Sequence, residues 1–192
     1  MLYRLYQARL RRSLTGANLP HHVAMIIDGN RRWARQRELE TAVNGHRAGA
    51  AKVREFLRWC DDLGVRVVTL YLLSADNLVG RQDDELRQLF VIIGDLATDL
   101  AEQGEWRIQH VGRTEGLPAE LVERLRDAET RTAGNTGLHV NLAVGYGGRR
   151  EIADAMREIV RSHGRGGGTI DDLADILTPE LIAENLYTQG QP

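Results

Sequence analysis

The stretch VAMIIDGNRRWARQ, residues 23–36, joins an apolar run directly to charged and polar residues. Its apolar residues 23–27 predict a short strand, and this strand ends in the carboxylate of Asp28. A carboxylate at such a place needs water, a cation or a hydrogen-bond donor. Two arginines follow at a loop-to-helix junction, where backbone N–H groups also favour an anion. The stretch therefore predicts a diphosphate held through a divalent metal ion, or alternatively a solvated turn with surface arginines.

The rest of the chain repeats the alternation of apolar strands and amphipathic helices. Residues 65–73 (VRVVTLYLL) become nearly all apolar, which is typical of a strand covered on both faces. Further strands are expected at 106–112 and 138–148, and helices at 46–63, 83–104, 118–134, 149–164, 170–177 and 179–187. Strands that alternate with helices form parallel sheets. We therefore predict one α/β domain with a mostly parallel sheet and helices on both faces.

The composition is that of an ordinary globular protein of 192 residues, which suggests one domain. A net charge of -2 gives no general attraction to nucleic acid, and an aromatic content of 5% argues against base stacking. The single cysteine, Cys60, cannot form an internal disulfide. No apolar run approaches the about 20 residues of a membrane span. We expect a cytoplasmic protein without a nucleic-acid partner.

Residues 2–14 (LYRLYQARLRRSL) predict a basic amphipathic helix. This helix either packs on the domain or contacts a membrane surface or a partner protein. Residues 18–20 (NLP) break the pattern. We therefore expect an N-terminal helix and linker at 1–20 and the main domain at 21–192, with possible peripheral membrane association through the helix.

Ligands of such sheets bind beyond the carboxyl ends of the strands, which points to residues 28–33, 74–81 and 145–149. At the first end, arginine forks suit phosphate, and a divalent ion such as Mg²⁺ would let Asp28 approach it. The third end is glycine-rich but carries no nucleotide-binding fingerprint.

At the second end, Ser74, Asp76 and Asn77 offer a hydroxyl, a carboxylate and an amide, although they are also ordinary residues at the start of a helix. Arg81 follows and either reaches the same ligand or lies on the surface. His46 is the first residue of the expected 46–63 helix, where it either hydrogen-bonds a phosphate or has a structural role.

Four blocks in order resemble the cis-prenyltransferases, the undecaprenyl diphosphate synthase family. They are HVAMIIDGNRRWA (22–34), GHRAGA (45–50), TLYLLSADN (69–77) and TAGNTGLHVNLAVGYGGRREI (132–152). The chain is most similar to the actinobacterial short-chain members that make Z,E-farnesyl diphosphate. The resemblance implies that an allylic diphosphate ionises, isopentenyl diphosphate attacks it, and loss of a proton leaves a Z double bond. It also implies Mg²⁺ and a homodimer.

Site residues follow from the resemblance. Asp28 would bind Mg²⁺ and be essential, while Ser74 and Asn77 would lie near the migrating proton. Because an amide is a poor base, Asn77 would position groups while a diphosphate oxygen takes the proton. The allylic substrate would be bound by Gly29, Asn30, Arg31, Arg32, Trp33 and His46, with Ala75, Asp76, Leu78 and Arg81 at the second end.

The chain departs from the family pattern at several positions. Ala75, Asp76 and Leu78 stand where the family has other residues around Asn77, and Ala42 replaces a common arginine. Leu72 is bulky where long-chain members are small, which favours a short product. The resemblance implies that residues 21–192 form the catalytic domain and that this domain is incomplete at its C-terminus, because the family's region for isopentenyl diphosphate is absent from these 192 residues.

Two other functions remain open at this point. The first is a non-catalytic diphosphate-binding or partner subunit of a prenyltransferase complex. The second is a phosphohydrolase with Asp28 as nucleophile. A phosphohydrolase would need a second aspartate two residues on, where Asn30 stands.

Overall fold

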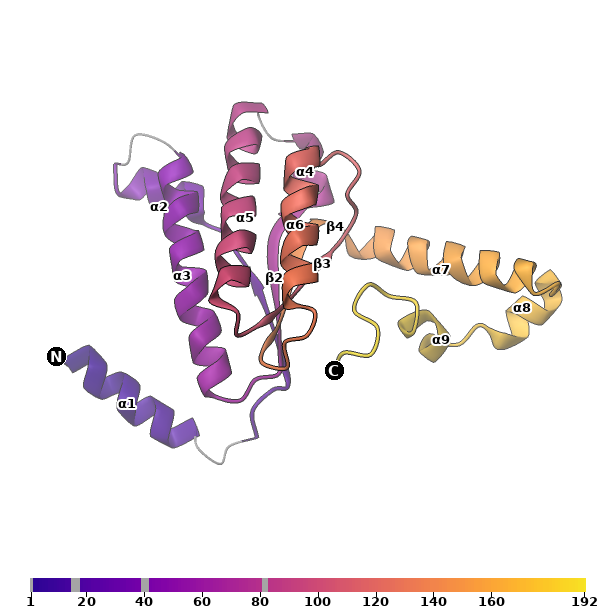
Figure 1. Cartoon of the computed structure of the whole chain (residues 1–192), viewed down its shortest axis with the longest axis horizontal. Coiled ribbons are helices and arrows are strands. Elements are labelled where there is room, and N and C mark those ends of the chain that lie inside the picture. Colours follow the sequence, from indigo (N-terminus) through magenta and orange to yellow (C-terminus); the bar gives the residue numbers. More distant parts are fainter. Residues whose placement is uncertain (1, 15–17, 39–41, 81–82) are drawn as a thin grey trace.

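The computed structural model describes residues 2–14, 18–38, 42–80 and 83–192 (Figure 1). Its sheet has four strands, all parallel, in the spatial order β1-β2-β4-β3. The strands are β1 (His22–Ile26), β2 (Val67–Ser74), β3 (Arg107–Val111) and β4 (His139–Tyr146). The predicted α/β domain with a parallel sheet is confirmed.

Helices alternate with these strands and close the chain. They are α1 (Leu2–Leu14), α2 (Asn30–Gln36), α3 (Ala42–Asp62), α4 (Ala75–Gly80), α5 (Asp83–Gln103), α6 (Ala119–Thr132), α7 (Gly148–Arg165), α8 (Ile170–Ile176) and α9 (Pro179–Ala183). The predicted helix at 46–63 begins four residues earlier than expected. α4 is a short helix where the sequence predicted only a turn or helix start.

Alternating side chains place the core on one face of the sheet. Val68 and Leu70 of β2 and Val140 and Leu142 of β4 are fully buried and belong to one apolar cluster. Helices α3, α5 and α6 cover this face (Figure 1). A period of two along each strand makes this arrangement inevitable once one face is apolar.

The opposite face of the sheet is polar at its centre. Thr69 and Asn141 are only 5% and 0% exposed, and Asn141 Nδ2 donates to Thr69 Oγ1 at 3.1 Å. Asn141 also donates to Gln191 Oε1 at 2.6 Å, and His22 Nδ1 lies 2.8 Å from the Pro192 carbonyl oxygen. Residues after α9 therefore return to this face, because its buried polar groups need partners.

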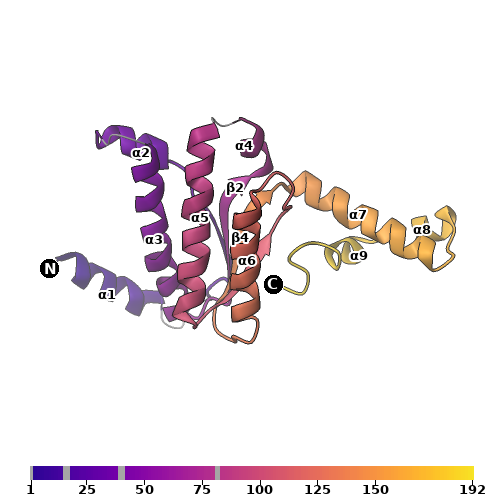
Figure 2. The same cartoon turned by 45° about the horizontal axis from the view of Figure 1, so that its top comes forward.

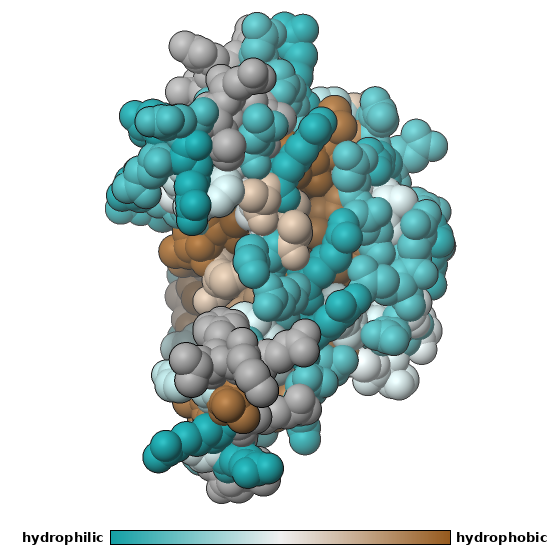
Figure 3. All heavy atoms as spheres, turned by 90° about the vertical axis from the view of Figure 1, so that its left-hand side faces the viewer, coloured by the Kyte–Doolittle hydropathy of each residue, from teal (hydrophilic) through white to brown (hydrophobic). Residues whose placement is uncertain are grey.

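Helices α7, α8 and α9 extend away from the sheet on the side opposite α3, in both views of the ribbon (Figure 2). Within the described residues, no helix combines the length and apolar character that crossing a membrane requires. The side that carries α1, α2 and α3 shows patches of hydrophobic atoms among hydrophilic ones (Figure 3).

Candidate active site

The three predicted strand ends meet at one edge of the sheet, because β1, β2 and β4 are neighbours and parallel. At the end of β1, the Asp28 side chain is 82% exposed, and its Oδ1 accepts a 2.6 Å hydrogen bond from the Gly29 N–H. Gly29 adopts a φ of 89°, a left-handed conformation that favours glycine. Arg32 Nη2 lies 4.0 Å from Asp28 Oδ2. A carboxylate and a guanidinium are thus presented together to solvent.

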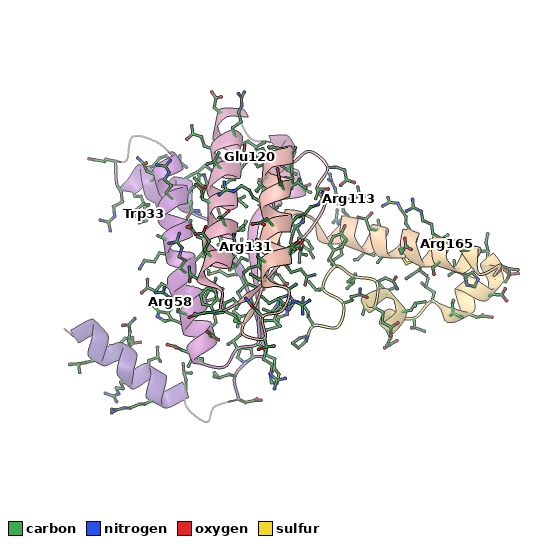
Figure 4. The ribbon with its side chains drawn as sticks, in the orientation of Figure 1. Trp33, Arg58, Arg113, Glu120, Arg131 and Arg165 are labelled. Atoms are coloured by element: carbon green, nitrogen blue, oxygen red, sulfur yellow. The ribbon has the colours of Figure 1, made fainter. Side chains whose placement is uncertain are left out.

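Helix α2 carries the arginines and packs closely on α3. A Cβ atom added at Gly45 would lie 2.3 Å from the Asn30 carbonyl oxygen, and one at Gly49 would lie 2.7 Å from Asn30 Oδ1. Ala34 on the same helix is buried. Trp33 projects from α2 and is 41% exposed, with the Arg37 guanidinium 5.9 Å from its ring centroid (Figure 4). The two glycines therefore fix where α2 stands.

Glu85, in the first turn of α5, connects α2 with α3. Its Oε1 lies 3.2 Å from His46 Nε2 and 3.8 Å from Arg31 Nε. The His46 and Glu85 side chains are 7% and 18% exposed, while that of Arg31 is 54% exposed. Glu85 is not among the site residues predicted from the sequence. The acidic start of the expected 83–104 helix could have indicated it, but the helix dipole alone also explains acidic residues there.

The placement of His46 corrects one prediction. Because α3 begins at Ala42, His46 lies inside the helix rather than at its N-terminus. Its imidazole is buried and contacts a carboxylate, so backbone N–H groups at a helix start do not assist it there. The neighbouring glycines receive α2 instead of a ligand. The additional first turn of α3 is what the sequence pattern did not reveal.

An apolar cavity begins beside this polar cluster. It encloses about 410 Å³ of empty space, counting the part open to solvent. Asn30 and His46 line it together with Leu72 of β2. The remaining lining residues come from the end of β1 and from α3 and α5: Ile27, Ala50, Val53, Leu89, Ile92, Ile93 and Leu96. Charged side chains and a cavity lined mostly by apolar side chains are therefore adjacent.

At the end of β2, Ser74 is exposed and its Oγ accepts a 3.2 Å hydrogen bond from the Asn77 N–H. Asp76 and Asn77 are exposed, whereas Ala75 is 3% exposed. Leu78 packs partly buried against the core. This geometry matches the ordinary helix-start alternative and still leaves the Asn77 amide open to a ligand. The predicted role of Arg81 falls outside the described residues.

The end of β4 is stabilised by hydrogen bonds. The Tyr146 hydroxyl donates to Glu151 Oε2 at 2.7 Å, and the Tyr187 N–H donates to Glu151 Oε1 at 2.9 Å. Burial, followed by the bond to Glu151, raises the pKa of Tyr146, so its hydroxyl stays protonated. The Tyr71 ring packs against it, with centroids 5.3 Å apart. These hydrogen bonds anchor the start of α7 at this strand end.

Asp154 of α7 ties together three distant parts of the chain. Arg113, in the loop after β3, donates two 2.8 Å hydrogen bonds to it (Figure 4). The Tyr187 hydroxyl donates a third at 2.5 Å. The bond from Tyr187, then the pairing with Arg113, lowers the pKa of Asp154. Burial and the bond to Asp154 raise the pKa of Tyr187 to about 12.

The residues at the first strand end fit Mg²⁺ only in partnership with a phosphate. Among the described residues, no group of three or more His, Cys, Asp or Glu side chains is placed to hold a metal ion. Mg²⁺ usually takes one or two carboxylates, substrate phosphates and waters. One exposed carboxylate beside an exposed arginine suits that mode, because the substrate supplies the other ligands.

Comparison with known proteins places this geometry in a family. A model of the undecaprenyl diphosphate synthase family matches residues 26–192. The chain is 50% identical over 191 residues to a (2Z,6E)-farnesyl diphosphate synthase of Thermobifida fusca, covering 100% of this chain and 74% of that protein. It is 47% identical to isoprenyl transferase 1 of Corynebacterium efficiens, covering 100% of this chain and 75% of that protein.

A solved structure supports the same assignment. Lavandulyl diphosphate synthase from Lavandula x intermedia, in complex with dimethylallyl diphosphate, superposes with a TM-score of 0.80 and 32% identity. The match covers 88% of this chain and 71% of that one. From the family match, the sequence relatives and the shared structure, the chain belongs to the undecaprenyl diphosphate synthase family of cis-prenyltransferases.

Proposed function

We propose that this protein condenses isopentenyl diphosphate with a geranyl or farnesyl allylic diphosphate to give a Z-configured isoprenyl diphosphate. The observation that carries the proposal is the juxtaposition of two environments. Asn30 and His46 line an apolar cavity, and the arginines of α2 stand beside them. A prenyl diphosphate needs this combination, because one end is a polyanion and the other a hydrocarbon.

The chemistry begins with loss of diphosphate from the allylic carbon. The C–O bond breaks, its electron pair leaves with the diphosphate, and the isopentenyl double bond attacks the allylic cation. A proton then leaves the new chain for a diphosphate oxygen. Arg31, Arg32 and the backbone N–H groups that begin α2 stabilise the charge gained by the departing diphosphate, and this preference for the transition state gives the rate.

Asp28 would hold Mg²⁺ together with phosphate oxygens, and the ion would supply further charge neutralisation. Gly29 lets the backbone approach the substrate, and Trp33 shields its outer side. Ser74 and Asn77 orient the isopentenyl group near the acceptor oxygen, with the neighbouring Ala75, Asp76 and Leu78 shaping that end of the site.

The product is short. Leu72 lines the cavity together with residues of α5, and its side chain limits the depth available to the growing hydrocarbon. Leu72→Ala should therefore lengthen the product.

Assembly and location extend the same proposal. The chain acts as a homodimer through the exposed apolar side chains of α7 and α8: Ile152, Val160, Ile170 and Ile176. Residues 21–192 carry the reaction, and residues 1–20 contact an anionic membrane surface peripherally. In α1, Leu5 and Tyr6 are 64% and 63% exposed on a helix that also carries four arginines. Sedimentation and vesicle-binding measurements test these two points.

The deciding experiment measures incorporation of radiolabelled isopentenyl diphosphate with geranyl and farnesyl primers, with and without Mg²⁺. We expect Mg²⁺-dependent product that Asp28→Asn abolishes. Asp127→Asn is the matched control, because Asp127 is an exposed aspartate on α6 that pairs with Arg131. If primers bind but no product forms under any condition, the alternative of a non-catalytic diphosphate-binding subunit replaces the enzyme.

A further inference from the structure

We infer that the Glu85 carboxylate competes with the substrate diphosphate for the donors of the site. The inference rests on the proposed function and deepens it. Glu85 Oε1 contacts His46 Nε2 at 3.2 Å and Arg31 Nε at 3.8 Å. These are two of the groups proposed to bind the allylic diphosphate. A single carboxylate oxygen thus takes the place of a phosphate oxygen at both donors.

The surroundings make this charge effective. The Glu85 side chain is 18% exposed and that of His46 is 7% exposed, so solvent screens their interaction only in part. The Arg31 side chain is 54% exposed, and its Nε lies farther from Glu85 Oε1 than a hydrogen bond reaches. Its guanidinium is therefore able to turn toward a stronger anion. A diphosphate carries several negative charges where Glu85 carries one, so it displaces Glu85 from these donors. It binds more weakly than it would if Glu85 carried no charge.

Such competition has a use in the reaction. Every condensation releases one inorganic diphosphate from the allylic site, and this product must leave before the next substrate binds. A carboxylate that returns to Arg31 and His46 weakens the binding of the product. Glu85 is thus a positioning residue that sets the diphosphate affinity of the site, and it does not itself touch the reacting carbon atoms.

A structural role predicts a different outcome. If Glu85 only stabilised the first turn of α5 and the orientation of His46, its neutralisation would weaken diphosphate binding. Competition predicts the reverse, because Gln keeps the size of the side chain and an acceptor oxygen for His46 but removes the repulsive charge. Repulsion between unit charges about 6 Å apart in an effective dielectric of about 20 corresponds to about 100-fold in affinity, and screening at this partly open site reduces the expected change to about tenfold.

The test measures the binding of inorganic diphosphate and of geraniol by calorimetry, without Mg²⁺, for the wild type and four variants. We expect Glu85→Gln to lower the Kd of inorganic diphosphate about tenfold and to leave that of the uncharged geraniol unchanged. Glu102→Gln, an exposed glutamate later in α5, is the matched control and should change neither. Glu85→Asp, which keeps the charge, should give no increase in diphosphate affinity.

Arg32→Ala separates this inference from the proposed function. It should weaken diphosphate binding, and if it does not, the diphosphate site itself is wrong. If Arg32→Ala weakens binding while Glu85→Gln leaves it unchanged or weaker, the competition is refuted and the site stands. Equal tightening for geraniol and diphosphate in Glu85→Gln also refutes the competition, because a change in packing would then be the cause.

Discussion

The close packing of α2 on α3 makes Gly45→Ala the most informative perturbation of this protein. The added Cβ would lie 2.3 Å from the Asn30 carbonyl oxygen and 3.0 Å from the Ala34 Cβ. Ordinary contacts begin at 3.4 Å, so the backbone of α2 has to move by about 1 Å. Overpacking of this kind costs about 1–3 kcal/mol. Alanine returns about 1 kcal/mol through its higher helix propensity, so we expect a net loss of about 1 kcal/mol of unfolding free energy.

The effect on activity should be larger than the effect on stability. Asn30, Arg31 and Arg32 move with α2, and a misplacement of about 1 Å costs about 100-fold in rate. Urea unfolding followed by circular dichroism gives the stability, and steady-state incorporation of isopentenyl diphosphate gives kcat/KM. Gly49→Ala should be milder, because its clash is with the rotatable Asn30 side chain.

Gly164→Ala is the matched control. Gly164 also lies in a helix, and a Cβ added there meets no atom within 4 Å, so this variant should be stabilised by up to about 1 kcal/mol with unchanged activity. If Gly45→Ala were stabilised like Gly164→Ala and retained full activity, the close approach of α2 to α3 would be wrong.

Three further predictions concern other parts of the molecule. The hydrogen bond from the Tyr187 hydroxyl is the main cause that lowers the pKa of Asp154. The ionised carboxylate therefore stabilises the fold at neutral pH, and this contribution is lost as the pH falls below the ordinary aspartate pKa of 3.8. The difference in unfolding free energy between Asp154→Asn and wild type should disappear over that range. Burial raises the pKa of Cys60 to about 11, so iodoacetamide at pH 8 should alkylate Cys60 far more slowly than it alkylates the free thiol of glutathione. Equal alkylation rates would contradict the burial of Cys60. Leu72→Ala should shift thin-layer chromatograms of the products toward longer chains, and an unchanged product would remove Leu72 from chain-length control.

The sequence predicted the fold better than it predicted the site. Apolar runs such as 65–73 and helical patterns such as 83–104 identified the elements, because burial on a sheet or helix follows local periodicity. It also predicted that three strand ends share one edge. It misplaced the start of α3, because helix boundaries depend on packing partners that lie elsewhere in the chain.

The α/β class, the parallel sheet and the residue types at the end of β1 could all be predicted from the sequence, because they depend on local patterns. That α2 packs against Gly45 and Gly49 is visible only in the tertiary structure. The same is true of the contacts of Glu85 with Arg31 and His46. These contacts join residues about 15 to 55 positions apart, and nothing in a local pattern specifies which distant side chains share a space. Those long-range contacts fix where the polar side chains at this edge of the sheet lie.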